Sequence, residues 1–401
     1  MFHFQALGAA NTRVRCVAEL LLVAIVSGAL SGASADDMRR IPQSNSTTDP
    51  TGTADWLQAG FDWAHTAFNR RETVLTPSKV THLMELWASP VGNGTLYTSP
   101  VVSGGKVFIG SGDGHMYAFD AATGATLWIG PGQELFFVDS AATGHGLVFA
   151  SSVYQTLLAY DAETGAIAWT SNLTDVRASP TLYHRILYVA SFDGTLTALD
   201  AVTGTPAWSA KGNCCVYDQA PVVDDGRVFQ MRTDHTLTAY NALTGRQLWS
   251  IPAFCVGSPA ASGGVLFFND YPNVVAVDEA TGTQLWTAPV LAFQPDGAPA
   301  VANGLVFVTT TSLMALDAAT GAVVWTARAA SSWGPVVAKG VVYASSQSGE
   351  WDAFDERNGS LLWSVTISSG CFFYCATAVP VVANGTVYLA GPDQYLRAFV
   401  P

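Results

Sequence analysis

Five cysteines are the residues whose chemistry stands out first. Leaving aside Cys16 in the N-terminal apolar segment, they are Cys214, Cys215, Cys255, Cys371 and Cys375. Cysteines of secreted chains usually form disulfides, and Cys371 and Cys375 are the natural local pair. The first three allow three pairings, and because five is odd, one thiol stays free or pairs between chains. We expect loop disulfides; the alternatives are a redox or cofactor-covering vicinal disulfide and a metal site, for which no nearby His pair completes a zinc set.

A second candidate group is polar and precedes a series of prolines. These prolines include Pro100, Pro221 and Pro335. When the loops are aligned on them, one aligned position holds Asp139, Gln219 and Trp333, and an adjacent position holds Arg177, Asp218 and Asp296. Equivalent loops carry small residues there. We expect this polar, partly acidic ring to line a binding site. The alternative is a hydrated lining in which Arg177 pairs with Asp218, and no hydrolase, zinc-protease or nucleotide-binding motif is present.

A repeat of about 40 residues supplies the elements that position these loops. Units such as VFIGSGDGHMYAFDAATGATLW end in a tryptophan, at Trp128, Trp169, Trp208, Trp249, Trp286, Trp325 and Trp363. Their spacing fits one four-stranded propeller blade. Alternating apolar residues indicate strands, Gly-rich and Asp-Gly pairs indicate hairpin turns, and the D-A-x-T-G turn offers an Asp that can accept backbone N–H groups.

The strand count predicts an eight-bladed, all-β propeller of four-stranded antiparallel blades. The last unit lacks its Trp strand, and HLMELWASP supplies one at the other end of the chain, with Trp87 placed 41 residues before Trp128. The N-terminal strand should therefore close the last blade, which removes open edges and favours a monomer. All five cysteines and the polar ring then fall on one face, the cysteine face, in loops between a blade Trp and the next inner strand. We expect a signal peptide over residues 1–35, a lead-in segment over 36–82 and the propeller over 83–401.

The N-terminus also indicates the compartment. Arg13 and Arg15 precede an apolar stretch, and Ala33-Ser34-Ala35 fits a cleavage site, so we expect a secreted chain, periplasmic in a Gram-negative bacterium, rather than a membrane-spanning one. A eukaryotic route could glycosylate five sequons, at Asn45, Asn93, Asn172, Asn358 and Asn384. The net charge of -13 argues against nucleic acid as a partner.

The repeats from about Trp56 to Pro401, most completely Val107 to Trp128, resemble those of PQQ-like propellers. This family includes pyrroloquinoline-quinone dehydrogenases and outer-membrane assembly scaffolds. The Cys214-Cys215 pair is similar to the vicinal disulfide that covers the quinone in quinoprotein alcohol dehydrogenases. Val-Tyr-Asp-Gln-Ala follows it, however, where those enzymes carry Asn-Arg-Gly, and the chain has no counterpart of their calcium-binding Glu, Asn and Asp set.

These observations favour a secreted, non-catalytic binding propeller that recognises a protein or small molecule on the cysteine face. The alternative from the enzyme class is a dehydrogenase that uses PQQ and calcium to oxidise an alcohol or sugar, which the resemblance and Trp333 suggest. A second alternative is an envelope assembly scaffold.

Overall fold

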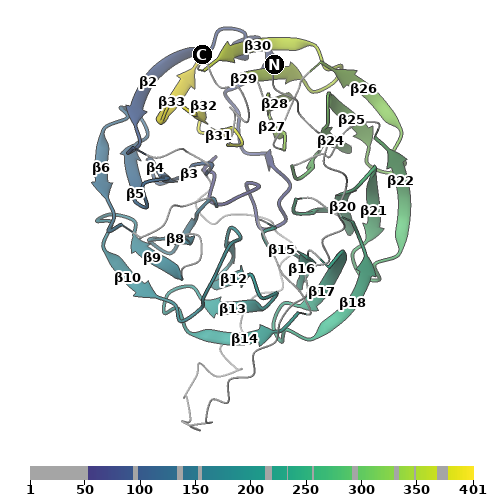
Figure 1. Ribbon diagram of the computed structural model, residues 1–401. Helices are drawn as coiled ribbons and strands as arrows, with labels where there is room; N and C mark the ends of the chain where they lie inside the picture. Colours follow the sequence, from purple (N-terminus) through teal and green to yellow (C-terminus); the bar gives the residue numbers. More distant parts are fainter. Residues whose placement is uncertain are drawn as a thin grey trace, which may run out of the picture.

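The computed structural model describes eleven stretches of the chain, and in them the chain forms a closed ring of eight β-sheets (Figure 1). The described residues are 53–93, 98–132, 139–151, 156–212, 219–232, 234–254, 257–290, 297–328, 334–346, 349–367 and 378–401. Asn45, the five cysteines, Trp333, Asp218 and Asp296 lie outside these stretches. No helix in the described residues is long and apolar enough to cross a membrane.

Each blade runs from a short inner strand to an outer strand that carries the tryptophan. Blades 1 to 4 consist of β3 (Val101–Ser103), β4 (Lys106–Gly110), β5 (Met116–Asp120) and β6 (Thr126–Ile129); β7 (Ala142–Gly144), β8 (Leu147–Ser151), β9 (Leu157–Asp161) and β10 (Ile167–Thr170); β11 (Thr181–Tyr183), β12 (Ile186–Ala190), β13 (Leu196–Asp200) and β14 (Pro206–Ala210); and β15 (Val222–Asp224), β16 (Arg227–Arg232), β17 (Thr236–Asn241) and β18 (Gln247–Pro252).

Blades 5 to 8 repeat this order, with two additions from the N-terminal part of the chain. They consist of β19 (Ala260–Ser262), β20 (Val265–Asp270), β21 (Asn273–Asp278) and β22 (Gln284–Pro289); β23 (Ala300–Ala302), β24 (Leu305–Thr309), β25 (Leu313–Asp317) and β26 (Val323–Ala327); β27 (Val336–Ala338), β28 (Val341–Ser345), β29 (Glu350–Asp355) and β30 (Leu361–Thr366), joined by β1 (Phe68–Asn69); and β31 (Val381–Ala383), β32 (Thr386–Ala390) and β33 (Tyr395–Val400), joined by β2 (Met84–Pro90).

The predicted closure of the ring is confirmed. Strand β2 pairs antiparallel with β33, from Met84 opposite Val400 to Pro90 opposite Tyr395. A four-residue helix, α2 (Pro77–Val80), leads from the N-terminal segment into this strand. The last blade is thus assembled from both ends of the chain, and the eight-bladed all-β architecture stands as predicted.

The recurrent tryptophans join neighbouring blades in the same way seven times. The indole Nε1 of Trp286, for example, donates to the carbonyl of Ala318 in the next blade at 2.9 Å. Its ring packs on Gly321, where a Cβ would lie 2.6 Å from Cε3 of Trp286. The same two contacts recur for Trp87, Trp128, Trp169, Trp208, Trp249 and Trp325. The turn glycine is therefore needed both for its positive φ and for the space that the ring occupies.

The turn aspartates act as the sequence predicted. Asp120 Oδ1 accepts hydrogen bonds from the backbone N–H of Thr123 at 2.8 Å and from its hydroxyl at 2.7 Å. Asp161, Asp200 and Asp317 make the same pair of contacts with the threonine three residues on. These hydrogen bonds favour the charged carboxylate, and they hold the pKa of Asp120 below its usual value.

Candidate functional site

The N-terminal segment crosses the centre of the ring and contacts the inner strand of every blade (Figure 1). We call residues 54–76 the plug. Six inner-strand N–H groups donate to plug carbonyls at 2.7 to 2.8 Å, those of Val102, Thr143, Val223, Ala261, Val301 and Val337. In the two remaining blades, Leu182 N–H donates to Gln58 Oε1 at 2.7 Å and Asn69 Nδ2 donates to the carbonyl of Val382 at 2.8 Å.

The contacts of the plug have a simple physical origin. An inner strand is the edge of its sheet, so its outward N–H groups need a partner. The residues contacted are the middle residues of the eight inner strands. A single irregular segment satisfies them in turn, and the buried side chains of Trp56 and Leu75 add apolar packing. The plug therefore fills the channel of the propeller and becomes part of its core.

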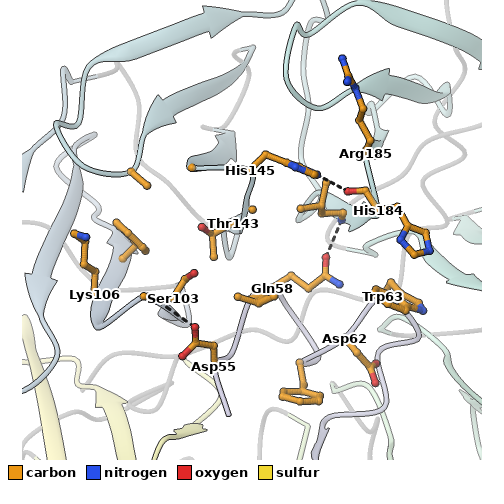
Figure 2. A pocket seen from close by; sticks show the side chains of 18 of the residues that line it. Asp55, Gln58, Asp62, Trp63, Ser103, Lys106, Thr143, His145, His184 and Arg185 are labelled. Carbon is orange, nitrogen blue, oxygen red and sulfur yellow. Dashed lines mark hydrogen bonds between the residues drawn. The ribbon is translucent and has the colours of Figure 1, made fainter. Parts of the chain in front are cut away.

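A cavity of about 520 Å³ lies between the plug and blades 1 to 3 (Figure 2). Its walls come from the turns that follow three inner strands, at Ser103–Lys106, at 143–146 and at 182–185. These turns leave the opposite ends of the inner strands from those that the cysteine loops enter, so the cavity lies on the other face of the ring, the turn face. We call it the plug-side cavity.

The floor of the plug-side cavity is apolar and its rim is charged. Plug and blade side chains form the floor, namely Leu57, Phe61, Trp63, Phe108 and Leu182. Trp63 packs edge-on against Tyr183, with ring centroids 5.1 Å apart. The rim carries Lys106, which is bound to Glu163 at 2.7 Å, and Arg185, which is bound to Asp200 at 2.6 Å. An apolar floor with a few charged groups is the usual character of a small-molecule site.

Hydrogen bonds hold the walls of this cavity in place. Asp55 Oδ2 accepts from Gly104 N–H at 3.0 Å, and His145 Nε2 donates to the carbonyl of His184 at 2.7 Å, as Figure 2 shows. Gln58, which is 3% exposed, ties the plug to blade 3 through Leu182. Burial and the neighbouring His145 lower the pKa of His184, so this side chain is neutral at pH 7.

Asp62 is a buried carboxyl group at the edge of the cavity. It accepts hydrogen bonds from the N–H and the hydroxyl of Thr66, at 3.0 and 2.8 Å, and lies 3.5 Å from Arg70. Burial outweighs these contacts and raises the pKa of Asp62 to about 6. Nearby in the plug, burial lowers the pKa of His65 to about 4, so this histidine is neutral in the folded chain.

A pair of carboxyl groups joins blades 4 and 5 on the turn face. Glu279 follows the turn aspartate, a place that alanine takes in blades 1 to 4 and in blade 6, and its side chain is hydrogen-bonded to Asp224 of blade 4. Glu279 is 2% exposed. Burial, followed by the charge of Asp224, raises the pKa of Glu279 to about 8. The two carboxyl groups therefore share a proton at neutral pH.

Replacing Glu279 with glutamine should make the chain more stable at alkaline pH. From the usual pKa of glutamate up to about 8, the folded chain keeps a proton that the unfolded chain releases, so the free energy of unfolding falls as pH rises through this window. Glu279→Gln keeps a donor towards Asp224 and removes this fall, which we expect to be roughly 2–3 kcal/mol between pH 5 and 8. Urea unfolding at several pH values between 5 and 8 measures this fall in the free energy of unfolding, with the substitution Asp193→Asn at an exposed residue as control. If the free energy of unfolding of Glu279→Gln fell with pH as steeply as that of the wild-type chain, the shared proton would be contradicted.

The described members of the predicted polar ring are held by protein contacts. Arg177 forms a bidentate pair with Asp175 at 2.7 and 3.1 Å and lies over the ring of Phe192. Asp139 is 8% exposed, and the carbonyl of Gln219 accepts from Gln230 Nε2 at 3.0 Å. Three serines close to this ring link neighbouring blades. The hydroxyls of Ser99, Ser140 and Ser179 each accept a hydrogen bond from a backbone N–H group of the preceding blade, which joins blades 8, 1, 2 and 3. Because Asp218, Asp296 and Trp333 lie outside the described residues, the ring stays a prediction.

The described residues of this region do not fit a calcium–quinone centre. Calcium takes six to eight oxygen ligands, several of them carboxylates. Within the described ranges, no three His, Cys, Asp or Glu side chains are grouped so that they could hold a metal. Asp139 is the one described carboxylate of the polar ring, and the guanidinium of Arg177 is bound to Asp175.

The four sequons of the described chain differ in their surroundings. Asn93, Asn172 and Asn358 are exposed. Asn384 is exposed as well, but its Nδ2 donates to Asp55 Oδ1 at 2.7 Å and its Oδ1 accepts from Ala54 N–H at 3.0 Å, so this side chain anchors the plug. Glycosylation of the sequons stays a prediction.

Sequence reasoning predicted a lead-in segment over residues 36–82 but missed the plug and its cavity. The segment has no hydrophobic period, because the eight plug residues that bond to inner strands each meet a different blade. The signal that could have revealed it is the density of large apolar residues before the first blade, at Trp56, Phe61, Trp63 and Phe68. Large apolar residues in an irregular segment need a surface that buries them, and the channel of the propeller offers one.

Comparison with known proteins agrees with the repeat pattern. The sequence profile of the PQQ-like family described as outer membrane protein assembly factor BamB matches residues 46–143, 132–216, 216–275 and 272–401. A search of curated proteins finds no significant match.

Solved structures with the same fold include both enzymes and an assembly factor. A europium-containing methanol dehydrogenase matches with a TM-score of 0.70 at 15% identity, over 86% of this chain and 89% of the enzyme. BamB from Moraxella catarrhalis matches with a TM-score of 0.66 at 16% identity, over 80% and 98%. The quinohemoprotein alcohol dehydrogenase of Comamonas testosteroni matches with a TM-score of 0.70 at 15% identity, over 92% and 82%. These identities show a shared fold, and the profile match shows that this chain belongs to the PQQ-like repeat propeller family.

Proposed function

We propose that this chain is a secreted, non-catalytic binding propeller whose ligand site is the plug-side cavity. The observation that carries the proposal is the cavity itself, with about 520 Å³ of space over an apolar floor. Four separate parts of the chain build it, the plug and the turns of three blades. Such a site has the size and lining that small organic molecules require.

Filling the cavity should abolish the binding of a small apolar probe. The neutral dye N-phenyl-1-naphthylamine should bind once per chain, with enhanced fluorescence and quenching of Trp63. Ser103 lines the cavity at the end of β3, and Ser103→Trp places an indole in that space, so we expect affinity to fall at least about tenfold.

Another blade of the propeller provides a matched control for this variant. Ser262 ends β19 and opposes Val265, as Ser103 ends β3 and opposes Lys106, but it does not line the cavity. Ser262→Trp should therefore leave dye binding unchanged. Equal losses in the two variants, or no stoichiometric binding by the wild-type chain, would overturn the proposal.

A second candidate function is an envelope assembly scaffold. The description of the matching family profile supports it, together with exposed apolar side chains on neighbouring outer strands, such as Met84 and Leu86 of β2 and Ile129 of β6. Exposed apolar residues gathered on one rim are typical of protein contacts. Crosslinking from cysteines introduced at Leu86 and Ile129, in the native envelope, should then capture one defined partner protein; the same yield from the exposed Asn172→Cys would contradict this function.

A further inference from the structure

The plug-side cavity is richer in positive charge than the chain as a whole. The chain has 18 Lys and Arg against 31 Asp and Glu. The residues that line the cavity reverse this balance, with four cations, Arg70, Arg71, Lys106 and Arg185, against three acids, Asp55, Asp62 and Glu163. His145 and His184 also line it. A locally cationic hollow in an acidic protein concentrates anions.

Two of the three acids are occupied by the protein itself. Asp55 accepts from Gly104 N–H and from Asn384 Nδ2. Asp62 is buried and accepts twice from Thr66, and its raised pKa of about 6 reduces its negative charge at mildly acid pH. Neither carboxylate is therefore placed to hold a ligand cation on the rim.

The cations of the rim, in contrast, are held by exchangeable pairs. Lys106 contacts Glu163, whose side chain is 74% exposed, and the Arg185 side chain is 58% exposed where it meets Asp200. Each pair has one partly buried partner, Lys106 at 20% and Asp200 at 17% exposed, and one exposed partner that water screens, so it contributes only modestly to stability. A ligand carboxylate or sulfonate can replace Glu163 beside Lys106 at small cost, and Arg185 offers a separate cation on another side of the cavity (Figure 2).

The floor beneath these cations is apolar and partly aromatic. Phe61 and Trp63 of the plug and Phe108 of β4 form it together with Leu57 and Leu182. This surface suits a flat hydrocarbon or aromatic body, and the rim suits one acidic group attached to it. We infer that the plug-side cavity takes an organic anion with an aromatic or otherwise apolar body, an inference that rests on the binding function proposed above.

Two dyes with matched bodies test the inference. Both 8-anilino-1-naphthalenesulfonate and N-phenyl-1-naphthylamine carry an anilinonaphthalene body, and the first adds a sulfonate. Titration followed by fluorescence should show the sulfonate dye binding at least about tenfold more tightly at low salt, and this advantage should shrink as salt rises to about 0.3 M.

Charge-removing variants locate the effect. Lys106→Gln/Arg185→Gln should lower affinity for the sulfonate dye about tenfold more than affinity for the neutral dye, and stoichiometric binding of the neutral dye shows that the cavity is intact. Arg246→Gln, an exposed cation of blade 4 outside the cavity, should change neither. Equal binding of the two dyes, or an unchanged sulfonate affinity in the double variant, would overturn the inference and leave the cavity as a neutral site. Failure of both dyes to bind would overturn the proposed function itself.

Discussion

Replacing Asn69 with alanine should destabilise the chain by about 3–4 kcal/mol, because one fully buried amide serves four backbone groups. Asn69 Nδ2 donates to the carbonyls of Ala54 and Val382, at 2.9 and 2.8 Å. Asn69 Oδ1 accepts from the N–H groups of Arg71 and Glu72, both at 3.1 Å. Alanine would remove a partner from each of these groups, of which those of Val382 and Glu72 are buried, at the point where the plug meets blade 8.

Urea unfolding of Asn69→Ala measures this loss. Asn172→Ala is the control, because Asn172 is exposed in a loop after β10, and we expect it to change the free energy of unfolding by less than about 0.5 kcal/mol. The plug also forms one wall of the cavity, so Asn69→Ala should weaken dye binding as well. A chain as stable as wild type would show that the plug is an appendage and not part of the core.

The second large effect concerns the contact between each tryptophan and the glycine of the next blade. Gly321→Ala should cost about 3–4 kcal/mol, whereas Gly304→Ala in the same blade should cost about 1 kcal/mol. Both glycines have positive φ, 74° and 80°, so both variants carry the same backbone strain. A Cβ on Gly321 would lie 2.6 Å from Trp286, whereas one on Gly304 would meet nothing within 4 Å.

The difference between these two variants isolates the packing of the indole. Urea unfolding of both variants measures this difference in the free energy of unfolding directly, because the backbone strain is the same in both and cancels. Trp286→Ala should relieve the clash, so that Gly321→Ala costs no more than about 1 kcal/mol in that background. Equal losses from Gly321→Ala and Gly304→Ala would mean that the ring does not pack as described.

The fold was predictable because its information is local and repeated. Most units carry a turn aspartate, a glycine and a tryptophan, and the missing Trp strand of the last unit pointed to Trp87. These features follow from a tryptophan contact that recurs between seven pairs of neighbouring blades. A repeat lets one correct local interpretation fix the whole ring.

The candidate site was not predictable by the same means. The plug bonds through its backbone carbonyls to six inner strands, and backbone contacts leave no side-chain pattern in the sequence. The pairing of Glu279 likewise leaves no local signal in the sequence, since its partner Asp224 lies 55 residues away in the preceding blade. The sequence directed attention to the cysteine face because its signals are side chains, whereas the cavity is created by the path of the main chain.

Hydrogen–deuterium exchange with and without N-phenyl-1-naphthylamine tests most directly whether the plug-side cavity is the ligand site. Binding there should protect the lining segments at 55–63, 103–108, 143–146 and 182–185. Protection confined to the described members of the predicted polar ring, at Asp139, Arg177 and Gln219, with no change in the plug, would contradict the account and return the site to that ring.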